Sequence, residues 1–170
     1  MTAYIAMLRA INVGGRKLLM SDLKTIGEEL GLGSPRTFIA SGNLLFTSAD
    51  SEEGLRERLE SRLSDHMGAE VPVLLRSATE MEAVAAANPF SEEPGNRVVA
   101  IFLNDPPPPD ALSHATGVRD ERMTLGSREI YVAYGSGMAD SKLRIPAAAK
   151  GTARNMNSVS KMATLAMEME

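Results

Sequence analysis

The chain has 170 residues, a net charge of −4, a hydrophobic fraction of 44% and no cysteine. The absence of cysteine excludes disulfides, thiolate catalysis and cysteine-ligated metal sites, and it favours a reducing compartment. No apolar run approaches the roughly 18 residues of a membrane span, and no signal peptide opens the chain. We therefore expect a cytoplasmic protein with no membrane partner.

Charge is unevenly distributed along the chain. Residues 51–93 hold ten acidic and four basic residues, whereas residues 140–161 hold five basic residues and one acidic residue. Two solvated faces of opposite sign would explain this pattern. The alternative is that the basic C-terminal stretch faces an anion.

The first half of the chain alternates strand and helix patterns. Four apolar or β-rich runs predict strands at residues 4–8, 37–39, 44–47 and 71–75. Ser21 predicts the N-cap of a helix that ends at Gly31, and Ser51 predicts the N-cap of a second helix. Leu55, Leu59 and Leu63 share one face of that second helix. The resulting order is the βαββαβ pattern of a ferredoxin-like unit.

The second half repeats this order after a third helix at residues 79–87. Strands are expected at residues 97–103, 119–124, 129–134 and 152–155, and short helices at residues 110–114 and 141–145. The proline run at 106–109 predicts a stiff connector, and Asn157 predicts the N-cap of a last amphipathic helix. The predicted fold is α+β, with two ferredoxin-like units in tandem and a C-terminal helix. The units would span residues 1–78 and 79–170, and whether they pack as one compact domain stays open.

A polar, glycine-rich segment follows the first predicted strand. Its residues of interest are Arg9, Asn12, Gly14, Gly15, Arg16 and Lys17. The segment matches neither GxxxxGK[ST] nor GxGxxG. Adjacent glycines can still adopt positive φ and turn successive amides into an anion-binding nest beside the two cations. A flexible connector before Ser21 explains the same residues.

The run Ser41-Gly42-Asn43 separates two predicted strands. A nucleophilic serine is not favoured, because the elbow motif GxSxG and a neighbouring histidine are missing. A turn with Gly42 and Asn43 in left-handed conformations is the alternative. The two histidines, His66 and His114, are isolated, so we predict no metal site.

Four further polar residues, Arg154, Asn155, Asn157 and Lys161, lie around the start of the last predicted helix. The first-turn amides of a helix are donors without intrahelical partners, so this region could bind an anion. A well-capped helix with surface bases explains it equally well.

Nucleic-acid binding is not favoured. Ferredoxin-like sheets can bind RNA through aromatic side chains on central strands. Phe38 and Phe46 flank the Ser41 to Asn43 turn, but the basic, aromatic-rich pattern of such domains is missing.

Several of these segments together resemble domain-of-unknown-function family 1697. The N-terminal part of the resemblance comprises residues 7–15, Met20, Asp22, Leu23 and residues 36–43. The downstream part comprises residues 88–90, 126–131, 141–143, 151–155, Asn157, Val159 and Lys161. Ala10 stands where the family usually has glycine, and Met156 stands where it usually has tryptophan, which removes a potential stacking surface.

The resemblance implies an α+β fold with ferredoxin-like units and a mostly bacterial distribution. It carries no activity, cofactor or catalytic residue over to this chain. The signature positions are largely Arg, Asn, Gly, Ser and Lys, and polar signature residues on loops favour a site over a core.

The leading hypothesis is therefore a protein that binds an anionic or phosphate-bearing small molecule at a cluster of polar loops. The segments 12–17, 41–43 and 154–161 would converge to form the cluster, together with Arg9. A protein–protein interaction module without a small-molecule site is the alternative. An enzyme is the third hypothesis, with Asp22 and Ser41 as the nearby reactive candidates. No cofactor is expected, and the oligomeric state is not predicted.

Overall fold

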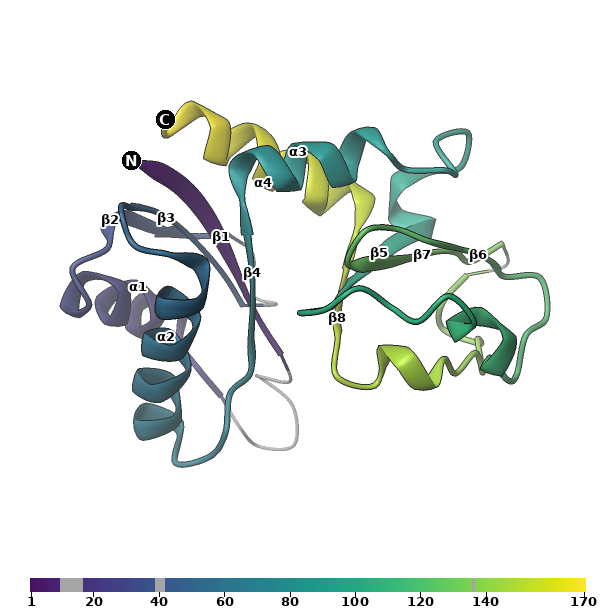
Figure 1. Cartoon of the computed structure of the whole chain (residues 1–170), viewed down its shortest axis with the longest axis horizontal. Coiled ribbons are helices and arrows are strands. Elements are labelled where there is room, and N and C mark those ends of the chain that lie inside the picture. Colours follow the sequence, from purple (N-terminus) through teal and green to yellow (C-terminus); the bar gives the residue numbers. More distant parts are fainter. Residues whose placement is uncertain (10–16, 39–41, 136) are drawn as a thin grey trace. The chain divides into compact units, whose positions relative to one another are not determined.

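The computed structural model of the chain describes residues 1–9, 17–38, 42–135 and 137–170 (Figure 1). The fold is α+β, with four α-helices and two four-stranded antiparallel sheets among these residues. The chain divides into two compact units. The first comprises Met1–Met81 and Met162–Glu170, and the second comprises Glu82–Lys161.

The first unit has the element order that the sequence predicts. Its elements are β1 (Thr2–Leu8), α1 (Met20–Glu29), β2 (Gly33–Thr37), β3 (Asn43–Ser48), α2 (Glu52–Met67) and β4 (Val73–Ser77). The strands lie in the order β2-β3-β1-β4, so β1 pairs on both sides. Tyr4, for example, lies opposite Phe46 of β3 and Ser77 of β4.

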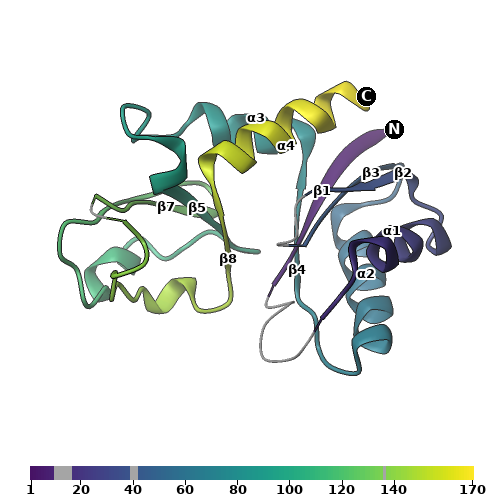
Figure 2. The ribbon, with the colours of Figure 1, turned by 180° about the vertical axis from the view of Figure 1, so that it is seen from behind.

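Both helices of the first unit cover the same face of its sheet (Figure 2). Alternate strand residues such as Ala6, Phe46 and Leu75 pack with the helices in one buried cluster. The cluster includes three leucines of α2 that the sequence predicts on one helix face: Leu55, Leu59 and Leu63. Their spacing of four residues is what aligns them toward the sheet.

The ends of the two helices differ in how well the sequence predicts them. The Ser51 hydroxyl accepts a hydrogen bond from Gly54 N at 3.2 Å, which confirms Ser51 as the N-cap of α2. The prediction of Ser21 as the N-cap of α1 is wrong. The helix begins at Met20 after Leu19, whose side chain makes no capping bond, and Ser21 already lies in the first turn. Gly31 ends this helix with a φ of +74°, as expected.

The second unit repeats the strand order of the first. Its elements are η1 (Gly95–Arg97), β5 (Val98–Phe102), η2 (Ala111–His114), β6 (Arg122–Leu125), β7 (Glu129–Ala133), η3 (Pro146–Ala148) and β8 (Thr152–Asn155), where η marks a 3₁₀ helix. The strands lie in the order β6-β7-β5-β8, so β5 takes the place that β1 has in the first unit. Two α-helices, α3 (Ala78–Ala86) and α4 (Met156–Glu168), span residues of both units.

Irregular segments replace the covering helices in the second unit. The connections β5–β6 and β7–β8 contribute Leu112, Ala115, Leu143, Ala147 and Ala148, which pack against a single buried cluster of the sheet. That cluster comprises Val99, Leu103, Ile130, Val132 and Ile145. Two crossing loops therefore cover one face of the second sheet.

The prediction of a helix at residues 141–145 is wrong. Arg144 instead forms an isolated antiparallel bridge with Thr116. Thr116 N donates to Arg144 O, and Arg144 N donates to Thr116 O, both at 2.9 Å. A partner 28 positions earlier in the chain therefore supplies the hydrogen bonds that a helix would have made internally.

No helix in the described part of the chain is long and apolar enough to cross a membrane.

Removal of the Ser51 cap is expected to destabilise the first unit. We predict that Ser51→Ala lowers the free energy of unfolding by about 1 kcal/mol, since the Gly54 amide loses its acceptor. Urea denaturation followed by circular dichroism measures the change. Ser61→Ala, at an exposed position within the same helix, is the control and should cause no loss. Equal losses in the two variants would contradict the capping role.

Candidate functional site

Part of the site expected from the sequence lies outside the described residues. This holds for Asn12, Gly14, Gly15, Arg16 and Ser41. The described members are Arg9, Lys17, Gly42, Asn43, Arg154, Asn155, Asn157 and Lys161, and they belong to two different units. The convergence of the three segments stays a prediction.

Asn43, at the start of β3, is hydrogen-bonded to Phe38. Its side-chain Nδ2 donates to Phe38 O at 2.8 Å, and Phe38 N donates to Asn43 O at 3.1 Å. The expectation of a left-handed Asn43 is wrong, because this residue is the first of β3 and lies opposite Met7 of β1. Gly42 does have positive φ, at +89°. The fully buried Asn43 is thus part of the fold, since it is bonded to Phe38 through both its side chain and its backbone.

Arg9, Lys17 and Gly42 lie at the ends of the described segments. Arg9 N donates to Pro72 O at 3.0 Å, and Gly42 O accepts from Leu8 N at 2.9 Å. Lys17 is exposed. These contacts hold the end of β1 between its two neighbours and leave the ligand-binding roles of the three residues as predictions.

Arg154 is a buried cation on β8. Its side chain is 6% exposed, and burial lowers the pKa of its guanidinium to about 10. Nη1 donates to Thr152 Oγ1 at 2.8 Å and to Ala153 O at 3.0 Å. Both of these acceptors are neutral and belong to the same edge strand.

The first unit has a counterpart of this arginine. Arg76 on β4 is 1% exposed, and its Nη1 donates to the carbonyl oxygen of the preceding residue, Leu75, at 2.8 Å. Arg76 lies opposite Ile5 of the central strand, just as Arg154 lies opposite Ala100. The repeated contact indicates that both guanidinium groups bind the backbone of an edge strand, a role that belongs to the fold.

The start of α4 is occupied by its own cap. Asn155 Oδ1 accepts a hydrogen bond from Ser158 N at 2.8 Å, so Asn155 and not Asn157 caps the helix. Asn157 lies against Gly95, where an added methyl group would be 2.1 Å from its Oδ1. Lys161 is exposed. A first-turn amide that was expected to be available to an anion is therefore already bonded to the chain.

The second unit contains a cavity that the sequence did not predict. Its volume is about 580 Å³, within the range typical of small-molecule sites. Ser141, Lys142, Leu143 and Arg144 line it, and this run of four residues is here called the cavity wall. The wall lies in the crossing connection between β7 and β8.

Three contacts hold the cavity wall in place. At its start, Ser141 Oγ donates to Glu121 Oε2 and accepts from Leu143 N at 3.2 Å. In the middle, Lys142 O lies so close to Gly117 that a methyl group there would be 2.1 Å from this oxygen. At its end, Arg144 is bridged to Thr116 by two backbone hydrogen bonds. The wall is therefore fixed before any ligand binds.

Glu121 is the buried anchor of the wall. Its side chain accepts from Ser141 Oγ and, through Oε1, from Arg119 N at 2.7 Å. The Ser141 hydroxyl is the largest cause that holds the pKa of the Glu121 carboxyl below its ordinary value, followed by the backbone amides. The nearby Tyr134 has its pKa raised, first by burial and then by the Glu121 charge. Glu121 is consequently a carboxylate at neutral pH.

The wall presents its two cations on one side. Leu143 and Ile145 pack toward the core of the unit, whereas Lys142 and Arg144 are exposed. This alternation is that of an extended chain, in which residues two apart point the same way. Within the described residues neither cation makes an ion pair or a side-chain hydrogen bond.

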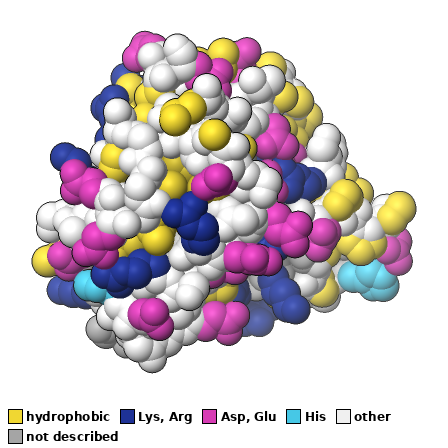
Figure 3. Space-filling view, turned by 60° about the vertical axis from the view of Figure 1, so that its left-hand side comes forward, with side chains coloured by type: hydrophobic (Ala, Val, Ile, Leu, Met, Phe, Trp, Pro, Cys, Tyr) yellow, Lys and Arg dark blue, Asp and Glu magenta, His cyan; other side chains and the backbone are white. Residues whose placement is uncertain are grey.

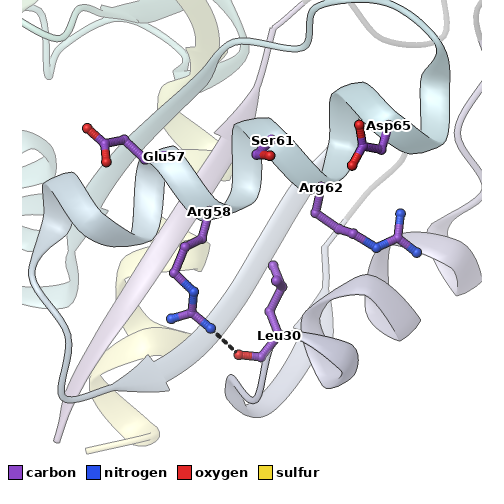
Figure 4. Close-up of a pocket in the computed structure, with 6 residues that line it drawn as sticks. All are labelled: Leu30, Glu57, Arg58, Ser61, Arg62 and Asp65. Atoms are coloured by element: carbon purple, nitrogen blue, oxygen red, sulfur yellow. Dashed lines mark hydrogen bonds between the residues drawn. The ribbon is translucent and has the colours of Figure 1, made fainter.

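The first unit has a smaller groove of about 380 Å³, shown in Figure 4, and its cations are already bound. Arg58 donates to the carbonyl oxygen of Leu30 and pairs with Asp50 at 2.8 Å. Arg62 pairs with Glu29 at 2.7 Å. These bonds connect α2 to the end of α1 and to the segment before α2. On the face shown in Figure 3, acidic and basic side chains are interspersed.

The described residues contain no group of three or more His, Asp or Glu side chains placed to hold a metal ion. The two histidines are each close to one carboxylate. His114 Nε2 lies 3.1 Å from Asp110, and His66 Nε2 lies 3.7 Å from Asp22. In the latter contact Asp22 connects α1 to the end of α2.

Comparison with known proteins places the chain in a family. The family described as "Protein of unknown function (DUF1697)" matches residues 1–131. The chain belongs to the DUF1697 family. The solved structure of the conserved bacterial protein SP0830 from Streptococcus pneumoniae matches this DUF1697 chain with a TM-score of 0.80 and 27% identity, over 96% of this chain and 98% of that one. A search of curated protein sequences finds no match.

The cavity wall of this DUF1697 protein was missed because residues 141–145 were expected to be helical. Two signals could have found it. The wall belongs to the basic stretch 140–161, and Ser141-Lys142-Leu143 is one of the segments that resemble the family. The run lies beyond residues 1–131, which the family description matches.

Substitution of Gly117 is expected to displace the wall. Gly117 and Gly68 have nearly the same φ, +69° and +68°, but nothing lies within 4 Å of a methyl group at Gly68. Gly68→Ala should cost about 1–2 kcal/mol for the left-handed conformation alone. Gly117→Ala should cost more, because the methyl group also meets Lys142 O. Urea denaturation measures both variants, and equal losses would contradict the close contact.

Acid is expected to loosen the wall through Glu121. Because its folded-state pKa is lowered, the contribution of Glu121 to stability is complete above the ordinary glutamate pKa and is lost as the pH falls through the lowered value. Between pH 6 and pH 3 the wild type should therefore lose more stability than Glu121→Gln, which cannot titrate. Urea midpoints at the two pH values test this. Parallel losses in both proteins would show that Glu121 does not contribute.

Proposed function

We propose that this DUF1697 protein binds an anionic small molecule in the cavity of its second unit. The observation that carries the proposal is the fixed wall with two exposed cations, Lys142 and Arg144, on the same side of a cavity of about 580 Å³. An anion can approach both cations without first displacing an ion pair. Other arginines of the described chain, such as Arg58, Arg62 and Arg122, are already paired with carboxylates.

The chemistry of the wall supports a phosphate-bearing ligand. Arginine offers a planar fork that matches the oxygens of a phosphate or carboxylate, and lysine offers a compact charge. The charges lie at the surface, so salt should weaken the binding.

The residues expected from the sequence remain part of the proposal as predictions. Arg154 and Lys161 belong to the same basic stretch as the wall. Arg9, Asn12 and the glycine-rich segment after β1 are proposed to contribute to ligand binding. A cytoplasmic location, expected from the cysteine-free sequence, also stays a proposal.

We propose further that both units are ferredoxin-like. The first has the order βαββαβ, and the strand order β2-β3-β1-β4 recurs as β6-β7-β5-β8 in the second. In the second unit two irregular crossings with short 3₁₀ helices would stand for the two helices of the motif.

A thermal-shift experiment tests the proposed function. The protein is screened at low ionic strength against nucleotides, phosphosugars and dicarboxylates. A ligand at 100 times its dissociation constant stabilises the folded state by about 2.7 kcal/mol, which corresponds to a rise in Tm of several degrees for a chain of this size. The double variant Lys142→Glu, Arg144→Glu should lose this rise.

Lys150→Glu is the matched control, because Lys150 is an exposed base of the same stretch outside the wall. It should keep the rise in Tm. A flat response of the wild type to every anion would overturn the proposal. A rise that survives the double variant would place the ligand elsewhere.

A further inference from the structure

We infer that the ligand carries two neighbouring anionic groups, as a diphosphate does, and that Lys142 and Arg144 each bind one of them. This inference rests on the proposed function and adds to it the charge pattern of the ligand. Three features support it: the spacing of the two cations, the contacts that hold the segment carrying them, and the position of the Glu121 carboxylate at Ser141.

Lys142 and Arg144 are spaced to contact two groups of one ligand. Lys142 and Arg144 are two residues apart in a segment with alternating exposure, so their Cα atoms are separated by about 7 Å, twice the rise of an extended chain. Both side chains are long and leave the same side of the segment. Their charged ends can therefore contact neighbouring groups of one ligand, whereas a single small anion would have to draw both ends together.

Contacts with other segments hold the backbone under the two cations. The two hydrogen bonds between Thr116 and Arg144 hold one end, and Gly117 is packed against Lys142 O. A segment held in this way does not contract around a small ion. The wall is already ordered in the folded protein, so binding loses little conformational entropy there. This favours a ligand that matches the existing spacing of the cations.

A carboxylate lies at the other end of the wall. The Glu121 carboxylate lies against Ser141, and its two oxygens already accept hydrogen bonds from Ser141 Oγ and Arg119 N. Its negative charge disfavours an anion beside Ser141 and so directs negative groups toward Lys142 and Arg144. The cavity of about 580 Å³ also exceeds the needs of one inorganic ion.

Binding of inorganic pyrophosphate and orthophosphate, measured by isothermal titration calorimetry in metal-free buffer of constant ionic strength, tests the inference. Pyrophosphate should bind the wild type at least tenfold more tightly than orthophosphate. Lys142→Gln and Arg144→Gln should each raise the Kd of pyrophosphate about tenfold and bring it close to that of orthophosphate. Lys150→Gln should leave both constants unchanged.

The variants alter exposed side chains, so their ligand-free Tm should equal that of the wild type. A change in Kd can then be attributed to lost ligand contacts and not to a loss of folded protein. Equal affinity for the two anions, or an effect of only one of the two substitutions, would overturn the inference while the proposed function stands. Absence of binding for both anions, together with a flat response in the thermal-shift screen, would instead overturn the proposed function.

Discussion

Each sheet of this protein is organised by a central strand that needs an antiparallel partner on both sides. β3 and β4 flank β1, and β7 and β8 flank β5. Two strands that are both antiparallel to the same neighbour run parallel to each other, so no tight turn can join them and the connection must cross a face of the sheet. In the first unit α2 makes this crossing, and in the second unit residues 134–151 make it. The cavity wall exists because the second crossing is not a helix.

The two kinds of crossing have different consequences for the surface. A helix bonds its backbone internally and turns a stripe of side chains, such as Leu55, Leu59 and Leu63, toward the sheet. An irregular crossing makes no regular internal ladder, so its backbone needs other partners, and here Thr116 of another connection and the crossing's own Ser141 hydroxyl provide them. It buries only alternate side chains, so charged residues can stand between buried ones. The equivalent crossing connection thus supplies core leucines in the first unit and exposed cations in the second.

The sequence predicts what local patterns determine. The leucine spacing of α2 and the Ser51 cap are both confirmed, and β6 and β7 lie in the region where two successive strands are expected. The extended conformation of Asn43 depends on Phe38, and that of the cavity wall depends on Thr116, Gly117 and Glu121. Phe38 is close to Asn43 in the sequence, but Thr116, Gly117 and Glu121 lie 20 or more positions before the wall residues they contact, so no local window of the sequence contains those bonds. Local patterns therefore favour a site at the glycine-rich segment and at the start of α4, and predict a helix where the wall lies.

The close contact between Gly117 and Lys142 O also has a consequence for relatives of this protein. A chain with any other residue at position 117 would have to move the cavity wall outward, and with it the two cations. The residue at position 117 therefore tests whether a relative can have the same wall geometry. A relative with another residue at this position cannot hold its wall where this protein does, whatever else in the fold the two share.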